Sequence, residues 1–373
     1  MNIKDELYSW FIRNVAVPNS FDFTKPGYVL SKTISGSDGM MLRDVFIPED
    51  LVCDLEVKTV EKLGTNGNRL LYTIGKNSSY IYAKFCGIET IKTKTKEKDY
   101  NKYTKSLLLF LGGIYGAAVD YFFDVKIGIQ RASFSQYVVC RKNGIGDLFL
   151  AGSAAGICSW LLQDTTTEVV QTECVGRGAA KCRILIASPD KIKQLGYAPI
   201  EFPTLLDLEM SKEYTSLNKP RNTINTKTSL RELLKNKTLS YKNGQITFCG
   251  GKYFNCDSHY IYFLEWLYND DVFLFGLAKE YYKKLGEAMG EKLGKQYITD
   301  ILGAMGWGDI AINDKKEAQI NYYPYTDLYA KTKYPIIRGM LSGLMTALYK
   351  EDTNLLNAKT SLEKDTFSLI LTG

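Results

Sequence analysis

Histidine is almost absent from this chain, because His259 is its one histidine among 373 residues. A catalytic triad that depends on an imidazole therefore has one possible position. Asp257 and Ser258 directly precede His259, and we predict that one of them caps a helix beginning there. The sequence offers neither a phosphate-binding glycine loop after a strand nor a pair of acidic residues suited to acid–base catalysis. We name no catalytic residue, and a protein that is not an enzyme is the favoured class.

Long hydrophobic runs are also missing. The longest, from Leu107 to Val119, is too short to cross a bilayer and is interrupted by glycine, and residues 1–6 lack the layout of a signal peptide. We therefore expect a cytoplasmic protein without a membrane span. In that compartment the eight cysteines are expected to be reduced thiols or metal ligands rather than a disulfide framework.

Basic residues exceed acidic residues only slightly, 47 against 41, for a formal net charge of +6. This charge permits a nucleic-acid partner without indicating one. One polar segment concentrates its lysines at Lys92, Lys94, Lys96 and Lys98, and tyrosines follow at positions 100 and 103. Basic side chains beside aromatic rings suit contact with single-stranded nucleic acid, whereas a solvent-exposed insertion explains the same pattern. Both interpretations stay open.

The stretch from Gly152 to Ile186 carries the most information. Its first part predicts a helix with one flank of small residues, Gly152, Ala155 and Gly156, against which another backbone can pack closely. A strand from Glu168, a turn at Gly176 and Gly178, and a returning strand from Cys182 are predicted to follow. This hairpin places Cys174 and Cys182 on either side of one turn.

This plan resembles the 4-vinyl-reductase domain, which closes with a glycine-rich helix, Glu-Cys, a short glycine turn and a second Cys entering an apolar strand. The residues that match are Gly152, Gly156, Glu173, Cys174, Gly176, Gly178 and Cys182. The resemblance implies the α/β fold that this family shares with TRAPP vesicle-tethering subunits. Similar domains are the sensory modules of phenol-responsive activators, so it also implies an aromatic-ligand pocket beside a zinc ion.

A zinc site would need ligands beyond the two hairpin thiols. Cys174 and Cys182 supply half of a tetrahedral set, and Cys158, Cys140 or Asp147 are candidates for the rest. In the zinc-binding relatives an acidic ligand precedes the first hairpin cysteine, and this chain has Gln171 there. Packed structural thiols and a disulfide are the alternatives.

The candidate ligand pocket is built from aromatic residues of the first half. We predict a long apolar helix from Ser106 to Asp124 as one wall and the helix carrying Trp160 as the other. The predicted lining residues are Tyr115, Phe122, Tyr137, Phe149 and Trp160. Such a pocket would take an apolar or aromatic molecule with one polar group, unless the protein's own side chains fill it.

The second half of the chain repeats this plan. Arg338 to Gly343 keeps the glycine spacing of the first copy, Gly286 is predicted to stand in the place of Gly75, and residues 355–356 and 367–371 are predicted as the closing strands. The predicted domains are residues 1–190 and 229–373, joined by a linker at 191–228. Since packing residues are kept and the thiols are lost, we expect the two copies to form a pseudo-dimer within the chain, with a homodimer as a further possibility.

The fold class predicted from these patterns is α/β (α+β), with two related domains that each pack helices on one side of a small antiparallel sheet. The favoured function is a non-catalytic regulatory or scaffold protein that binds a small apolar or aromatic molecule, a protein partner or both, with structural zinc possible in the first domain. An enzyme subunit in tetrapyrrole vinyl reduction and a nucleic-acid-associated factor are the alternatives.

Overall fold

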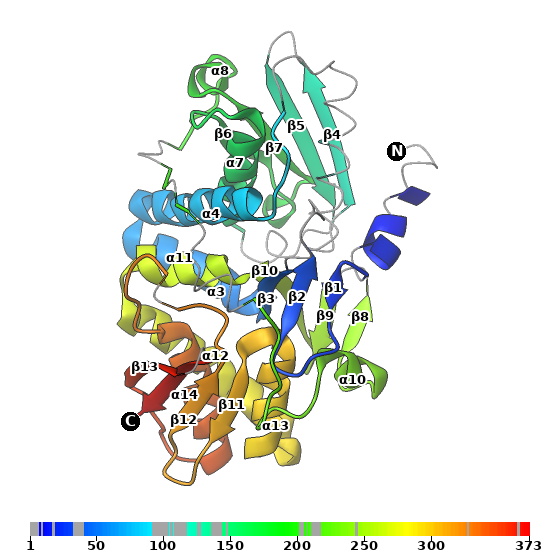
Figure 1. The fold of residues 1–373 in the computed structure, drawn as a ribbon. Helices are drawn as coiled ribbons and strands as arrows, with labels where there is room; N and C mark the ends of the chain where they lie inside the picture. The colour runs from blue at the N-terminus through cyan, green and yellow to red at the C-terminus, as the bar shows by residue number, and fades with distance from the viewer. Residues whose placement is uncertain are drawn as a thin grey trace. The chain divides into compact units, whose positions relative to one another are not determined.

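The computed structural model divides the chain into two compact units (Figure 1). The first unit comprises Met1–Ser20, Val52–Leu208 and Lys242–Gln245, and the second comprises Phe21–Leu51, Glu209–Tyr241 and Ile246–Gly373. Residues 21–51 thus group with the C-terminal half, whereas the predicted boundary at residue 190 assigned them to the first domain. The structure describes the whole chain except residues 1–6, 9, 17–18, 33–40, 92–103, 105–106, 108–117, 125–127, 136–143, 147, 201–204, 207, 210–217, 243–244, 327 and 364–365.

The first unit is built around one antiparallel sheet and two long helices. Its strands are β4 (Ala118–Asp124), β5 (Ile129–Ser135), β6 (Glu168–Glu173) and β7 (Cys182–Ala187), in the spatial order β4-β5-β7-β6. Its helices are α3 (Glu49–Leu63), whose first turn belongs to the second unit, α4 (Thr65–Phe85), α7 (Leu148–Leu162) and the short α8 (Pro189–Gln194). Helix α7 packs on one face of the sheet, and α4 packs along α7 (Figure 1).

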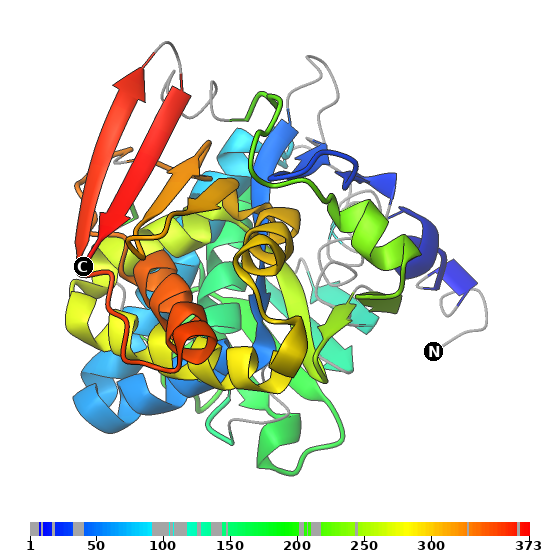
Figure 2. The ribbon, with the colours of Figure 1, turned by 90° about the horizontal axis from the view of Figure 1, so that it is seen from below.

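The second unit contains the same arrangement. Strands β11 (Asp309–Ile312), β12 (Ala318–Asn321), β13 (Asn357–Glu363) and β14 (Thr366–Thr372) form an antiparallel sheet in the order β11-β12-β14-β13. Figure 2 shows β13 and β14 as the red hairpin beside the C-terminus. Helices α12 (Asp271–Met289) and α14 (Pro335–Tyr349) pair as α4 and α7 do, and the other helices are α10 (Leu230–Lys235), α11 (Ser258–Tyr268) and α13 (Lys295–Leu302). The identical strand order confirms the predicted fold class.

Glycines fix the register of the helix pair in each copy. A Cβ atom at Gly152 would collide with the carbonyl oxygen of Tyr72, and one at Gly156 with that of Lys76. In the second copy the corresponding collisions are between Gly339 and Phe275, and between Gly343 and Lys279. Because the paired positions keep equal spacings, Tyr72 corresponds to Phe275 and Lys76 corresponds to Lys279. The helices of each pair therefore cross at equivalent residues, and glycine at the crossing lets the two backbones approach closely.

A third sheet, almost all of whose residues belong to the second unit, joins distant parts of the sequence. Its six strands are β1 (Phe21–Asp22), β2 (Val29–Lys32), β3 (Met41–Pro48), β10 (Gly251–Asp257), β9 (Gln245–Phe248) and β8 (Ser240–Lys242), in that spatial order. Strands β3 and β10 pair antiparallel at its centre, with Phe46 opposite Asn255. Each of these strands runs directly into a helix, α3 or α11, so the pairing joins equivalent elements of the repeat.

Several predicted elements of the first half are wrong. The dipeptide Asn66-Gly67 predicts a turn, but both residues lie inside helix α4. The helix predicted from Ser106 to Asp124 is contradicted at its end, because residues 118–124 form strand β4. A short apolar run fits a helix or a buried strand equally well, and the aromatic and β-branched residues here favour the strand. The pattern predicts strands at residues 126–129 and 133–140, and within the described residues one strand, β5, joins parts of both as Ile129–Ser135.

Two details of the predicted repeat also need correction. Gly286 does not correspond to Gly75, because the helix register places Ala278 there. Leu355 and Leu356 precede the first closing strand, which begins at Asn357. Leu355 is instead a fully buried residue whose N–H donates to the Ser342 hydroxyl, so burial rather than strand pairing explains its apolar character.

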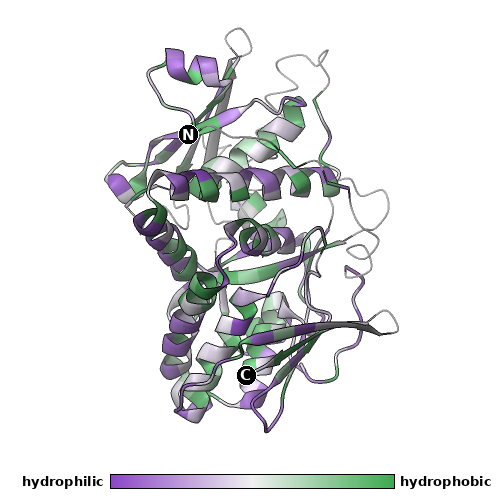
Figure 3. Cartoon of the chain, turned by 90° about the vertical axis from the view of Figure 1, so that its left-hand side faces the viewer, coloured by the Kyte–Doolittle hydropathy of each residue, from purple (hydrophilic) through white to green (hydrophobic). Residues whose placement is uncertain are grey.

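Two predicted helix caps are confirmed. The Asp257 carboxylate accepts the backbone N–H of His259 at the start of α11, and it lies 2.8 Å from the imidazole Nδ1. The sequence Ser229-Leu230-Arg231-Glu232 predicts a capping box, and Ser229 and Glu232 form it reciprocally at α10. Several helices carry both hydrophobic and hydrophilic residues along their surface (Figure 3), whereas α7 is apolar along nearly its whole length. None of the described helices has both the length and the apolar composition needed to cross a membrane.

Candidate functional site

The predicted aromatic lining residues are only partly described. Tyr115 and Tyr137 lie outside the described residues. Phe122 belongs to strand β4, where its backbone is opposite Arg131 of β5, so it is not on a helix as predicted. The lysines predicted to contact nucleic acid, Lys92, Lys94, Lys96 and Lys98, are also outside the described residues, and that hypothesis stays a prediction.

Phe149 and Trp160 lie at opposite ends of helix α7. Eleven residues separate them, which corresponds to about 16 Å along a helix. The Phe149 N–H donates to Glu56, and its carbonyl lies against Gly75 of α4. The Trp160 indole N–H donates to the carbonyl of Ile88 at 2.7 Å. The structure therefore does not bring these two rings together, and their role in ligand binding stays a prediction.

The hairpin cysteines are buried at the two ends of the predicted turn. Cys174 and Cys182 are thiols rather than a disulfide, and the Val175 N–H donates to the Cys182 sulfur at 3.4 Å. Cys158 is also buried, and burial raises the pKa of its thiol to about 12, so it is protonated at neutral pH. Among the described residues, no three histidine, cysteine or acidic side chains are grouped to hold a metal, and Cys140 and Asp147 lie outside them. Zinc binding stays a prediction.

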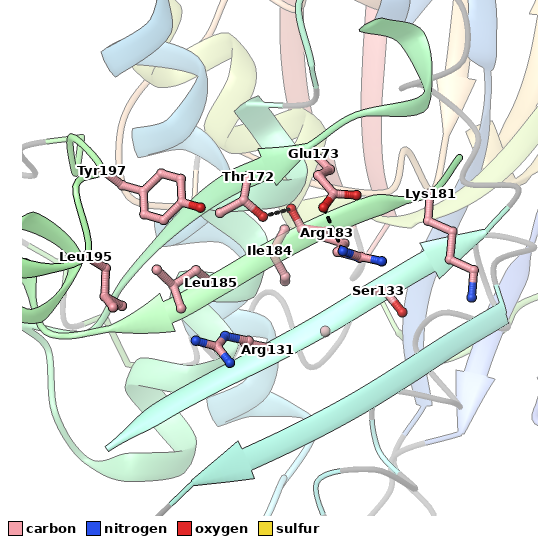
Figure 4. A pocket seen from close by; sticks show the side chains of 11 residues that line it. Arg131, Ser133, Thr172, Glu173, Lys181, Arg183, Ile184, Leu185, Leu195 and Tyr197 are labelled. Carbon is pink, nitrogen blue, oxygen red and sulfur yellow. Dashed lines mark hydrogen bonds and ion pairs between the residues drawn. The ribbon is translucent and has the colours of Figure 1, made fainter. Parts of the chain in front are cut away.

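An open groove of about 570 Å³ lies on the outer face of the first unit's sheet (Figure 4). Arg131 and Ser133 of β5 point outward because they alternate with the buried Ala132 and Phe134. The register places Arg183 of β7 opposite Ser133 and Leu185 opposite Arg131. The other lining residues shown in the figure are Thr172, Glu173, Lys181, Ile184, Leu195 and Tyr197.

Helix α8 and the residues that follow it close one end of this groove. Ile192 of α8 joins Ile129, Val170, Leu185 and Ala187 in a small buried cluster on the outer face. That cluster anchors the segment leading to Leu195 and Tyr197, whose side chains are 41% and 42% exposed. The groove therefore has an apolar end, made by Leu185 and these two exposed side chains.

Three cations line the groove. Arg131 lies opposite Leu185, beside the apolar side chains, whereas Arg183 and Lys181 lie further along the sheet with one carboxylate, Glu173 (Figure 4). Glu173 and Arg183 form an exposed ion pair with a separation of 2.7 Å. The remaining positive charges lie on side chains exposed to solvent, where they can attract an anion. An apolar surface next to excess positive charge suits an amphipathic anion.

A second group of polar residues is buried between helix α4 and strand β6. Lys76 donates from Nζ to the Glu168 carboxylate at 2.7 Å and to the backbone carbonyls of Thr165 and Thr167 at 3.2 and 3.0 Å. The Tyr72 hydroxyl donates to the same carboxylate and accepts the Val169 N–H at 3.0 Å. We call Tyr72, Lys76 and Glu168 the buried triad.

Burial opposes charge throughout the triad. It lowers the pKa of Lys76 and raises the pKa of Glu168, while their contact with each other acts in the opposite direction. Burial also raises the pKa of Tyr72, and the neighbouring Glu168 raises it further. The Lys76 side chain is 0% exposed, so protein oxygens take the place of water around its ammonium. The triad is a structural network, because no solvent reaches its cation.

The second copy replaces two members of the triad by apolar residues. Phe275 stands at the position of Tyr72, and Leu355 is at the position of Glu168 when the copies are aligned on their glycine helices. The lysine is retained, but Lys279 contacts the side chains of Asp352 and Asn354. These two residues correspond to Thr165 and Thr167, whose carbonyls hold Lys76. A different residue therefore supplies the carboxylate in each copy, Glu168 in the first and Asp352 in the second.

A buried carboxyl group in the second unit makes stability depend on pH. Glu265 of α11 accepts the Ile336 N–H at 3.1 Å. Burial raises the pKa of Glu265 from its ordinary 4.5 to about 8, against hydrogen bonds from Tyr325 and Ile336 that lower it. Between these pH values the folded state keeps a proton that the unfolded state loses. We therefore expect stability to fall as pH rises from about 5 to about 8.

The Glu265→Gln substitution tests this expectation, because it removes the titration and keeps a similar shape. Urea midpoints of the second unit should decrease from about pH 5 to about pH 8 in the natural protein and decrease less in the variant. The exposed Glu291 provides the matched control, since Glu291→Gln should leave the pH slope unchanged. An equal slope in all three proteins would contradict the assignment.

Neither the groove nor the triad was predicted from the sequence. The alternation of exposed and apolar residues in β5 is a signal for an outward-facing pair, Arg131 and Ser133. The triad has no comparable local signal, since Lys76 and Glu168 are 92 residues apart. Aligning the two copies would have shown the changes to Phe275 and Leu355.

Comparison with known proteins leaves the family open. No family model matches the chain, and no curated protein matches it. One similar solved structure is the phenol-responsive sensory domain of the transcription activator PoxR with phenol. The two chains are 16% identical, and the alignment covers 51% of this chain and 95% of that chain with a TM-score of 0.35. The resemblance to the 4-vinyl-reductase domain stays a prediction.

Proposed function

We propose that the first unit is a non-catalytic binding module for a small amphipathic anion, within a regulatory or scaffold protein. The observation that carries this proposal is the groove on the outer face of the sheet. Its apolar end holds Leu185 and Tyr197 with Arg131 beside them, and Arg183 and Lys181 lie further along the groove. A carboxylate would contact the cations while an aromatic or aliphatic group covers the apolar end.

Rigid surroundings support binding at this groove. The side chains Arg131 and Arg183 come from neighbouring paired strands, and Thr172 donates its hydroxyl to the Arg183 carbonyl at 3.3 Å. Side chains on strands hold their spacing better than side chains on loops. The Arg183 guanidinium also contacts Glu173, so a ligand anion would share it with this carboxylate. We therefore expect modest affinity.

A matched pair of probes tests the proposal on the full chain. In isothermal titration at about 0.15 M salt, 4-phenylbutyrate should bind at least tenfold more tightly than 4-phenylbutanol, which lacks the charge. The double substitution Arg131→Gln with Arg183→Gln should weaken 4-phenylbutyrate binding at least tenfold, because two of the three cations are removed.

Lys193→Gln is the control for net charge. Lys193 is exposed on α8 and does not line the groove, so its loss should change affinity less than twofold at this ionic strength, where screening acts over about 8 Å. Equal binding of the acid and the alcohol, or equal weakening by Lys193→Gln and by the double substitution, would contradict the proposal.

A further inference from the structure

A second open cavity, of about 740 Å³, lies in the second unit along the C-terminal ends of α12 and α14. Gly286 of α12 and Ala347 of α14 are among its lining residues, and they lie against each other. A Cβ atom at Gly286 would be 2.7 Å from the Cβ of Ala347. Small side chains at this crossing therefore leave the space beside the helices open. We call this cavity the slot.

The equivalent place in the first copy is filled by Trp160. Trp160 lies eight residues after Gly152, as Ala347 lies eight residues after Gly339, so the two positions correspond. The Trp160 ring packs edge-on against Tyr80, with 5.7 Å between ring centroids. Its indole N–H donates to the carbonyl of Ile88 at 2.7 Å.

The residues around Trp160 have counterparts that line the slot. Tyr80 is four residues after Lys76, and Lys283 is four residues after Lys279. Ile88 corresponds by the same offset to Glu291, and both follow a glycine with positive φ, Gly87 or Gly290. Lys283, Gly290 and Glu291 all line the slot. The second copy thus keeps the backbone positions that surround the indole ring, with Lys283 in place of the Tyr80 ring, and lacks the indole itself.

We propose that the slot binds a small indole-type aromatic amine. The ring would occupy the position in the second copy that is equivalent to the position of the Trp160 ring in the first copy. Its N–H would donate to the backbone carbonyl of Glu291, which corresponds to the backbone carbonyl of Ile88. The slot is lined by four carboxylates and two lysines, which favours a cationic substituent over an anionic one.

The partner for the amine follows from the ion pairs around the slot. Glu351 and Asp352 pair with Lys316 and Lys279. Glu287 is 4.0 Å from Lys283, the outer limit of an ion pair, so it retains much of its capacity for a second cation. Glu291 is exposed at the slot and lies beside the carbonyl proposed to accept the indole N–H. Glu291 and Glu287 are therefore the better partners for the amine.

Titration of the full chain with three indoles tests the proposal. Tryptamine should bind with a stoichiometry of one, indole should bind more weakly, and indole-3-acetate should bind at least tenfold more weakly than tryptamine. Ala347→Trp should weaken tryptamine binding at least tenfold, because the new ring fills the slot. Val272→Trp is the control, since Val272 is 84% exposed on α12 outside the slot, and it should leave binding unchanged.

A second variant keeps the test valid if Ala347→Trp does not fold. Trp160→Ala empties the corresponding place in the first copy, where Tyr80 remains as a ring partner. Indole should then bind with a stoichiometry of two. Failure of tryptamine to bind at millimolar concentration, or unchanged tryptamine affinity in a folded Ala347→Trp protein, would overturn the proposal. So would an unchanged indole stoichiometry in Trp160→Ala.

Discussion

Replacing Glu168 by leucine should destabilise the first unit by about 3–5 kcal/mol, the cost of removing one partner from a buried ion pair. The Lys76 ammonium is 0% exposed, and the substitution removes its carboxylate partner. Only the neutral carbonyls of Thr165 and Thr167 then remain in contact with it. It also removes the acceptor of the Tyr72 hydroxyl. Urea denaturation measures the loss as a lower midpoint for the first unit.

The second copy supplies the rescue. Leu355 stands where Glu168 stands, and Lys279 is held there by Asp352 and Asn354. Adding Thr165→Asp and Thr167→Asn to Glu168→Leu should therefore restore part of the lost stability.

Removing all three polar side chains of the triad together separates the charge effect from the packing effect. The combined variant carries Tyr72→Phe, Lys76→Met and Glu168→Leu. It should cost far less stability than Glu168→Leu alone, because it leaves no charge buried and keeps side chains of similar volume.

An exposed carboxylate of the same strand gives the control for these variants. Glu173 pairs with Arg183, but both side chains are substantially exposed to solvent. Glu173→Leu should therefore change stability by less than about 1 kcal/mol. If Glu168→Leu were no more destabilising than Glu173→Leu, the buried triad would not be the structural network described above.

A single methyl group at Gly156 should have a comparable effect, about 3 kcal/mol of destabilisation. In Gly156→Ala the new Cβ would collide with the carbonyl of Lys76 and lie 2.8 Å from the Tyr80 nitrogen. Both atoms belong to the backbone of α4, which cannot move aside as a side chain can, so the two helices must separate. Gly343→Ala should act in the same way on the second unit, where the collision is with Lys279.

Gly276→Ala is the matched control, because Gly276 is also helical but a Cβ atom there has no neighbour within 4 Å. This substitution should raise stability by about 0.5–1 kcal/mol, since alanine loses less backbone entropy than glycine in a helix. Circular dichroism during thermal unfolding gives the melting temperatures of the Gly156→Ala, Gly343→Ala and Gly276→Ala proteins for comparison. A melting temperature for Gly156→Ala equal to that of Gly276→Ala would contradict the close helix contact.

Local patterns predicted much of the repeat but little of the sites. The glycine helix, the hairpin after it and the caps at Asp257 and Ser229 follow from residues near one another in sequence, and all are confirmed. Strand β4 was mistaken for helix because a run of apolar residues does not by itself distinguish the two.

The sites depend on longer-range relations. The groove forms where β5 and β7 pair, so its cations are neighbours only after the sheet is assembled. The slot exists because Ala347 replaces the aromatic residue found at position 160, a difference that becomes visible once the helix register is known. In each case, the missing information is which residues face each other across two elements.

The central pairing of β3 with β10 has a consequence for the ancestry of this chain. Phe46 lies opposite Asn255, and each residue is three positions before the helix that follows its strand. The pairing of β3 with β10 therefore joins equivalent positions of the two copies. In a shorter ancestor with one copy, the same strand of two molecules would pair in this way. After duplication the two strands belong to one chain, so the residues on each side can change independently. The unlike residues Phe46 and Asn255 at equivalent positions are an example of such a change.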